Sequence, residues 1–224
     1  MVEISTSILS VKKGEESQTF FALEKAHTDY FHIDVMDGKF VEKDTYNKML
    51  SYAEYIKRIS NLPLDVHLMV NNVEHAINDF EVVEPNIITF HYEVCNNKEE
   101  IMKYINKIKE IHSKVGISVK PDTPIEKVYE FLPYIHVCLV MTVEPGKGGQ
   151  TMLSEMVQKV QKLKQYIDEN NLEVDIEVDG GIYHKNVAEV LAAGANVMVS
   201  GSGVFKGDIK DNTAKFMEIL NGNV

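Results

Sequence analysis

Short apolar runs rich in β-branched residues alternate along the chain with segments whose apolar residues recur at helical spacing. The apolar runs indicate buried strands, expected at residues 3–8, 30–35, 64–69, 87–91, 115–119, 137–142, 174–178 and 197–200. The segments between them are apolar on one face, which is typical of amphipathic helices. These helices are expected at residues 15–26, 46–59, 73–82, 101–111, 125–132, 157–167, 185–193 and 212–220.

Strands that alternate with helices pair in parallel through right-handed crossovers. The 224 residues supply eight such units, each long enough for a strand, a helix and two loops. Eight units close into a barrel more naturally than they extend as an open sheet. The expected fold class is therefore α/β, a single (β/α)8 TIM barrel. Because no linker or low-complexity segment interrupts the pattern, residues 1–224 are expected to form one domain.

Composition and charge narrow the range of partners. With 44% hydrophobic and 25% charged residues, the chain has the composition of a globular protein. Its net charge of −11 repels nucleic acids and anionic bilayers. The N-terminal residues do not resemble a signal peptide, and Cys95 and Cys138 have no disulfide or CxxC pattern. We therefore expect a cytoplasmic protein that binds neither nucleic acid nor membrane.

Two histidines and two aspartates fall near the ends of three predicted strands. His32 and Asp34 are two residues apart and share one strand face, His67 comes near the end of the third strand, and Asp179 follows the seventh. In such barrels, functional side chains gather at the carboxyl ends of the strands. Imidazole and carboxylate together suit divalent transition metals. The pattern therefore predicts a metal site formed by these four side chains.

Glycine-rich turns follow the sixth, seventh and eighth predicted strands. They contain Gly146, Lys147, Gly148 and Gly149, then Gly180 and Gly181, then Gly201, Ser202 and Gly203. Glycine lets backbone N–H groups approach an anion closely, and loops after the last strands form the usual phosphate site of this barrel. The turns therefore favour a phosphorylated ligand.

Met36, Met69 and Met141 each follow or end a strand at the same rim. They either pack in the core or form an apolar collar over the reacting carbon.

Four motifs in order along the chain resemble the ribulose-phosphate 3-epimerase family. They are HIDVMDGKFV at 32–41, LDVHLMV at 64–70, MTVEPG at 141–146 and EVDGG at 177–181. The likeness begins with STSILS at 5–10 and ends at Gly201 and Ser202. It covers nearly the whole chain.

The resemblance implies a role for each candidate residue. It implies that His32, Asp34, His67 and Asp179 bind one divalent metal ion per chain, which is Zn²⁺, Fe²⁺, Mn²⁺ or Co²⁺. Asp34 and Asp179 would also act as proton acceptor and donor. The implied substrate contacts are Ser7, His67, Gly146, Lys147, Gly148, Gly149, Asp179, Gly180, Gly181, Gly201 and Ser202. The three methionines would form the apolar collar.

The resemblance also implies an activity and an assembly. Family members interconvert D-ribulose 5-phosphate and D-xylulose 5-phosphate in the pentose phosphate pathway, as dimers or hexamers. Inverting carbon 3 requires removing its proton, stabilising an enediolate, and returning a proton to the opposite face. Two carboxylates, one on each face, suit this chemistry, while a metal ion stabilises the negative charge that develops.

Three departures from the family pattern bear on the choice of sugar. Residues 42–45 read EKDT where the family usually has Pro-Asn and a longer loop, Lys147 replaces an aromatic residue, and Lys120 replaces an asparagine. An alternative is therefore an epimerase of a ketohexose phosphate such as D-allulose 6-phosphate. A second alternative is a non-catalytic paralogue that binds sugar phosphates. Because Asp34 and Asp179 are both present, the epimerase interpretation is favoured.

Overall fold

Eight parallel strands close into a barrel in the computed structural model, which describes residues 2–222. The strands are β1 (Glu3–Ser7), β2 (Tyr30–Met36), β3 (Leu64–Met69), β4 (Ile87–His91), β5 (Lys114–Val119), β6 (Val137–Met141), β7 (Asp175–Asp179) and β8 (Val197–Ser200). Each strand pairs with the next along the chain, and β8 pairs with β1 to close the ring. This arrangement confirms the predicted (β/α)8 barrel.

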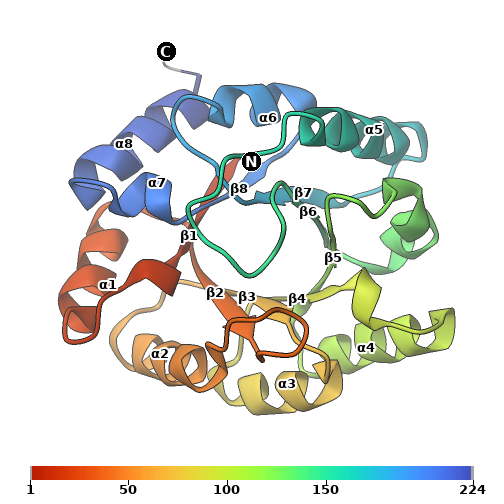
Figure 1. Cartoon of the computed structure of the whole chain (residues 1–224), viewed down its shortest axis with the longest axis horizontal. Coiled ribbons are helices and arrows are strands. Elements are labelled where there is room, and N and C mark those ends of the chain that lie inside the picture. The colour runs from red at the N-terminus through yellow and green to blue at the C-terminus, as the bar shows by residue number, and fades with distance from the viewer. Residues whose placement is uncertain (1, 223–224) are drawn as a thin grey trace.

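The helices form an outer ring around the strands (Figure 1). They are α1 (Glu16–Lys25), α2 (Tyr46–Ile59), α3 (Val73–Phe80), α4 (Lys98–Glu110), α5 (Met156–Glu169), α6 (Val187–Ala193), α7 (Ser202–Phe205) and α8 (Ile209–Leu220). Short 3₁₀ segments are η1 (Ile8–Ser10), η2 (Glu81–Val83), η3 (Tyr92–Val94) and η4 (Ile125–Tyr134). Within residues 2–222, no helix combines the length and apolar character needed to cross a bilayer.

Two of these elements differ from the sequence prediction. An α-helix was expected at residues 125–132, whereas the structure forms the 3₁₀ helix η4, which contains Pro133. Proline has no backbone N–H and disfavours a continuing α-helical turn. The short helix α7 directly follows Gly201 and was not predicted, because four residues are too few to display helical periodicity.

Alternation along β2 explains how the sheet separates an apolar layer from a polar interior. Phe31, Ile33 and Val35 are fully buried in the large hydrophobic core, where Phe31 packs edge-on against Phe20 of α1. Successive side chains of a strand point to opposite faces. The intervening His32 and Asp34 therefore point into the barrel.

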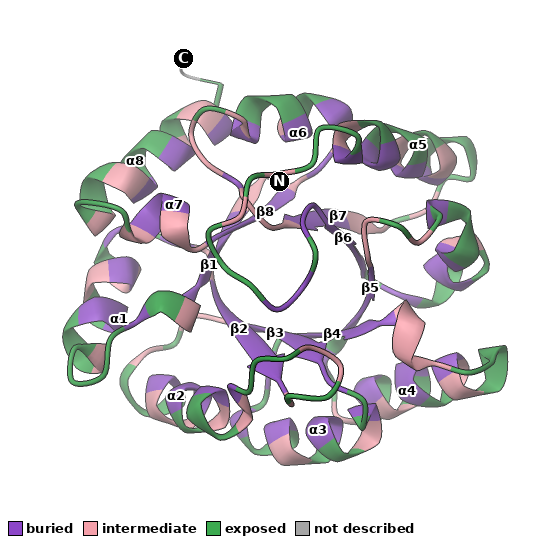
Figure 2. Ribbon diagram, viewed as in Figure 1, coloured by how far each residue is buried: buried purple, intermediate pink, exposed green. Residues whose placement is uncertain are grey.

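The interior of the barrel is unusually polar. Inward positions of such barrels are mostly filled by Val, Ile and Leu. Here the buried positions along the strands include Ser5, Ser7, His32, Asp34, Asp65, His67, Thr89, Ser118 and Glu177. Figure 2 shows the ring of strands as largely buried, while the exposed surface lies on the outer sides of the helices and on the loops. The buried polar groups are therefore inside the barrel, where they can build a site.

Candidate functional site

The structure brings together the four side chains that the strand pattern predicted to converge. His32, Asp34, His67 and Asp179, here termed the His/Asp cluster, each offer a ligand atom, and these atoms all lie within 4.8 Å of one another. Strand register explains part of this arrangement, because Asp34 of β2 is paired directly with His67 of β3. Asp179 reaches the same point from the end of β7.

The distances within the His/Asp cluster fit a bound cation. Nε2 of His32 lies 3.4 Å from Oδ1 of Asp34 and 4.0 Å from Oδ2 of Asp179. Nδ1 of His67 lies 3.7 Å from Asp34 Oδ1 and 3.6 Å from Asp179 Oδ2. Ligand atoms about 2.1 Å from a metal are separated by about 3–4 Å from one another. The four side chains therefore already have the spacing of a coordination shell.

Two buried nitrogens at the centre of the cluster also point to a cation. Among residues 2–222, His32 Nε2 and His67 Nδ1 find no hydrogen-bond partner. Both histidines are fully buried. A buried polar atom without a partner is costly. A metal ion bound by these nitrogens and the two carboxylates would remove that cost, so the residues present fit the metal that the sequence suggests.

Asp65 orients the His32 ring from its other edge. The Nδ1–H of His32 donates to Oδ2 of Asp65 at 2.6 Å, and the hydroxyl of Ser5 donates to the same oxygen at 2.7 Å. Oε1 of Glu177 lies 3.6 Å from His32 Nδ1. A carboxylate behind a histidine fixes the tautomer that presents the opposite nitrogen to a metal. His32 is therefore held with Nε2 facing the cluster.

The charges around His32 are predominantly negative. Burial by itself would lower the pKa of His32, but the Asp65 and Asp34 carboxylates outweigh it and raise that pKa well above its ordinary value. Burial tends to raise the pKa of Asp34, but His32 lowers it below the usual range. Burial and the Asp65 charge raise the pKa of Glu177 well above its ordinary value. The Asp34 and Asp65 carboxylates give the site a strong affinity for positive charge.

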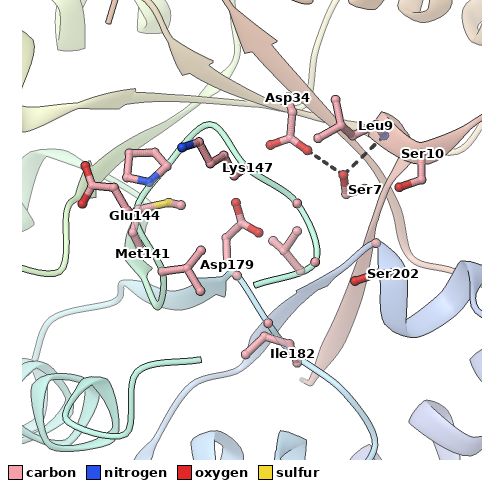
Figure 3. A pocket seen from close by; sticks show the side chains of 18 residues that line it. Ser7, Leu9, Ser10, Asp34, Met141, Glu144, Lys147, Asp179, Ile182 and Ser202 are labelled. Atoms are coloured by element: carbon pink, nitrogen blue, oxygen red, sulfur yellow. Dashed lines mark hydrogen bonds between the residues drawn. The ribbon is translucent and has the colours of Figure 1, made fainter. Parts of the chain in front are cut away.

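A cavity opens above the cluster at the carboxyl ends of the strands. Asp34 and Asp179 both line it, and Figure 3 shows their carboxylates on facing sides. The Ser7 hydroxyl donates to Oδ2 of Asp34 at 2.5 Å. The rest of the lining includes the predicted substrate positions Lys147, Gly148, Gly149, Gly180, Gly181, Gly201 and Ser202. In the described part of the chain, Gly146, His32 and His67 stay outside this lining.

Backbone packing requires glycine in the turn after β7. Gly181 has a φ of +68°, and a Cβ atom there would lie 2.5 Å from the backbone nitrogen of Met152. The neighbouring turn after β6 holds β7 in place, because the Thr142 hydroxyl donates to the carbonyl of Asp179 at 2.9 Å. The loop after β6 therefore packs directly against the end of β7 and against the glycine turn that follows it.

The three methionines are placed differently. Met141 lines the cavity, whereas Met36 and Met69, at the ends of β2 and β3, do not. All three side chains are almost fully buried. Register pairs Met36 with Met69 directly across the two strands. Contact with the cavity is therefore seen for Met141, and the collar role of all three methionines stays a prediction.

The departures from the family pattern differ in their distance from the cavity. The hydroxyl of Thr45 donates to the carbonyl of Asp34 at 2.6 Å and anchors the end of β2. Lys120 Nζ lies 3.2 Å from Oε1 of Glu144 and 4.7 Å from the centre of the Phe40 ring. Of the departing residues at 42–45, 120 and 147, all within the described range, Lys147 is the one that lines the cavity.

Sequence reasoning assigned no role to the polar residues that stand behind the cluster. His91, the last residue of β4, places Nε2 2.9 Å from Nε2 of His67, and Glu93 contacts the far side of His91. Asp65 and Glu177 each precede a cluster residue by two positions and so share its strand face. That two-residue spacing is the signal that could have identified both carboxylates.

Comparisons with known proteins agree on one family. Residues 3–205 match the model of the ribulose-phosphate 3-epimerase family. The ribulose-phosphate 3-epimerase of Methanocaldococcus jannaschii is 39% identical over 94% of this chain and 87% of its own length. The enzymes of the same name from Synechocystis and Bacillus subtilis are 36% and 34% identical, over 99% and 92% of this chain and 92% and 93% of their own lengths.

Solved structures support the fold. The 3-hexulose-6-phosphate synthase of Salmonella typhimurium aligns with a TM-score of 0.72 at 13% identity, over 99% of this chain and the whole of that chain. A phosphoribosylanthranilate isomerase of Thermotoga maritima aligns with a TM-score of 0.69, also at 13% identity, with the same two coverages. At this identity, the likeness establishes the barrel and carries nothing about substrate.

Proposed function

The chain belongs to the ribulose-phosphate 3-epimerase family of isomerases, and from this premise we propose that it converts D-ribulose 5-phosphate to D-xylulose 5-phosphate. The relatives that match nearly its whole length carry the name of that activity. The proposed reaction inverts carbon 3 by removing a proton from one face and returning one to the other.

The pair Asp34 and Asp179 carries this proposal. Their carboxylates come from β2 and β7, face each other across the cavity (Figure 3), and lie at similar distances from Nδ1 of His67. A planar enediolate held between them would expose one face to each carboxylate. This is the geometry that inversion at one carbon requires.

In the forward direction, the Asp34 carboxylate accepts the proton from carbon 3. The electron pair of the broken C–H bond becomes part of the enediolate. Asp179, in its acid form, donates a proton to the opposite face of the same carbon. The pair then has the protonation states needed for the reverse reaction. The Ser7 hydroxyl, which donates to Oδ2 of Asp34, holds that carboxylate in position and favours its ionised form.

The His/Asp cluster is the proposed site of one divalent transition metal ion per chain, either Zn²⁺, Fe²⁺, Mn²⁺ or Co²⁺. When bound, such an ion supplies Lewis-acid stabilisation of the negative charge that develops on the substrate oxygens. The protein residues provide the two imidazole nitrogens and two carboxylates. Asp65 fixes the orientation of His32 by the 2.6 Å hydrogen bond.

The glycine turns are proposed to bind the substrate phosphate. Gly148, Gly149, Gly181 and Gly201 line the same cavity as the two carboxylates, and Ser202 adds a hydroxyl. Glycine allows close approach of backbone N–H groups to an anion. Anchoring the phosphate at this side would fix the distance from it to carbon 3. The length of the sugar would then decide which carbon lies between Asp34 and Asp179.

A ketohexose phosphate such as D-allulose 6-phosphate is the alternative substrate. Its extra carbon needs additional room between the phosphate turns and the carboxylates. Residues 42–44 are exposed, and Thr45 anchors Asp34, so this changed segment gives no support for a longer pocket. A non-catalytic binding role is disfavoured because both carboxylates are present and both line the cavity.

A panel of ketose phosphates, incubated with metal-loaded protein in deuterated water, tests the proposal. Nuclear magnetic resonance follows both deuterium incorporation at carbon 3 and formation of the epimer. We expect D-ribulose 5-phosphate to have a higher kcat/KM than D-allulose 6-phosphate, and unphosphorylated D-ribulose to be poor. A tenfold preference for the hexulose phosphate would favour the alternative substrate. A lack of deuterium exchange with every compound in the panel would contradict an enzymatic role.

We also infer a cytoplasmic homo-oligomer, a dimer or a hexamer, from the properties that the family resemblance implies. Analytical ultracentrifugation of the purified chain measures the assembly directly. A monomer at micromolar concentration would contradict this inference without affecting the proposed chemistry.

A further inference from the structure

His67 contacts a second buried histidine on the side that faces away from the His/Asp cluster. Its Nε2 lies 2.9 Å from Nε2 of His91, the ring centres are 5.0 Å apart, and the two ring planes are inclined by 28°. Both histidines are fully buried. At this distance there is room for one proton between the nitrogens. One ring must therefore donate, and the other must accept.

Glu93 determines which nitrogen of His91 carries the proton. Oε2 of Glu93 lies 3.0 Å from His91 Nδ1, while Oε1 accepts from the backbone N–H of Lys120 at 2.7 Å and from the Thr123 hydroxyl at 2.5 Å. A backbone N–H can only donate, so Oε1 must be an acceptor. Burial tends to raise the pKa of Glu93, but its contacts with His91, Thr123 and the Lys120 backbone lower it to about 2, so the carboxylate is ionised and also accepts through its second oxygen. The proton therefore lies on Nδ1 of His91.

A single proton arrangement satisfies both ends of this chain of contacts. Neutral His91 with its proton on Nδ1 has a lone pair on Nε2, which accepts from the Nε2–H of His67. His67 then has its lone pair on Nδ1, which faces Asp34 and Asp179 at 3.7 and 3.6 Å. The opposite tautomer of His67 would direct an N–H into the cluster and exclude a cation.

We propose that His91 and Glu93 are positioning residues, which hold His67 in the tautomer whose Nδ1 is free to bind a divalent metal ion. This inference rests on the metal site of the proposed function and deepens it. The contact between the two histidines is shielded from solvent, because both are fully buried and the centre of the Phe40 ring lies 4.7 Å from that of His91. The pair stands behind His67 as Asp65 stands behind His32, so each metal histidine has its own buried acceptor.

The substitution Glu93→Gln tests the proton arrangement. A glutamine must place its carbonyl at Oε1 to accept from the Lys120 N–H, so its NH₂ group faces His91 Nδ1. That group donates, which moves the His91 proton to Nε2 and the His67 proton to Nδ1. We expect the affinity for Co²⁺, measured by competition with a chelator, to fall about 10- to 100-fold. Glu74→Gln on α3, a partly exposed residue paired with Lys103, is the matched control.

Two substitutions at His91 separate tautomer control from simple packing. His91→Gln retains an acceptor for the His67 Nε2–H and a donor for Glu93, so Co²⁺ affinity should stay within about threefold of the unaltered protein. His91→Phe fills a similar space without an acceptor, and we expect it to weaken Co²⁺ binding about 10- to 100-fold. Thermal melting of each metal-free variant checks folding. If Glu93→Gln fails to fold, the two His91 variants still provide the comparison.

The tautomer itself can be read by long-range proton–nitrogen spectra of the Zn²⁺-loaded protein. We expect the His67 proton on Nε2 and the His91 proton on Nδ1. Unchanged Co²⁺ affinity in both Glu93→Gln and His91→Phe would overturn the inference while leaving the metal site intact. A His67 proton on Nδ1 would overturn both the inference and the role of His67 as a metal ligand. A wild-type chain that binds neither Co²⁺ nor Zn²⁺ would instead contradict both this inference and the metal in the proposed function.

Discussion

His32 donates a fully buried hydrogen bond of 2.6 Å to Asp65, its direct partner across strands β2 and β3. This contact directs Nε2 of His32 toward Asp34 and Asp179. Because a buried carboxylate holds the ring, the site is arranged before any metal binds. The position of the His/Asp cluster therefore depends on residues that themselves never reach the cavity.

The first prediction concerns Asp65→Asn. An asparagine can still accept from His32 through its carbonyl. It lacks the negative charge that holds the His32 ring and makes that imidazole a stronger metal ligand. We expect metal affinity to fall about 10- to 100-fold, measured by chelator competition with Co²⁺. Asp208→Asn, at the N-cap of α8, is a matched control because asparagine also caps helices. Equal Co²⁺ affinity in the two variants would show that Asp65 does not act on the metal.

Removing either imidazole should remove the metal. His32→Ala and His67→Ala each leave three ligands. We expect metal affinity to fall by more than about 100-fold, which is a larger loss than the one expected for Asp65→Asn. Elemental analysis of purified protein measures the bound metal per chain. Retention of about one ion per chain in both variants would place the metal elsewhere.

The two carboxylates should each be essential for turnover. Asp34→Asn and Asp179→Asn remove a proton acceptor or donor, and general acid or base steps contribute roughly 10²- to 10⁴-fold each. Since both residues also belong to the His/Asp cluster, metal content must be measured beside the rate. Near-normal epimerisation by either variant would refute the role assigned to that residue.

Lys147→Phe tests the departing residue that lines the cavity. If the ammonium group contributes mainly to uniform binding of the phosphate, KM should rise while kcat changes little. The KM of the unaltered protein should also rise with salt, because screening weakens an exposed charge interaction. Lys43→Phe in the exposed part of the changed segment is the control. A fall in kcat with constant KM would instead assign Lys147 to the chemical step.

The sequence predicted the barrel well because each strand carries its own apolar signal. Predicted limits for β3, β4 and β8 match the structure, and period-two alternation correctly placed His32 and Asp34 inside. The type of helix at residues 125–134 was wrong, since an amphipathic pattern does not distinguish an α-helix from the 3₁₀ helix that forms beside Pro133.

The residues behind the site were harder to predict because their roles depend on contacts between distant strands. Asp65 reaches His32 through the register of β2 with β3, which the local pattern of either strand leaves undefined. In the sequence, His91 is only a polar residue at the end of a predicted strand. Its contact with His67 depends on the pairing of β4 with β3. Its link to Glu93 further depends on the fold of the short η3 segment.

The most direct test of the account follows metal content and epimerisation of D-ribulose 5-phosphate in the same preparation. The metal is removed by exhaustive chelation and then restored with Zn²⁺, Fe²⁺, Mn²⁺ or Co²⁺ in separate samples. We predict that activity falls in proportion to the bound metal and returns as about one ion per chain is restored. Full activity in metal-free, folded protein would contradict the central claim that the His/Asp cluster performs this reaction with a divalent cation.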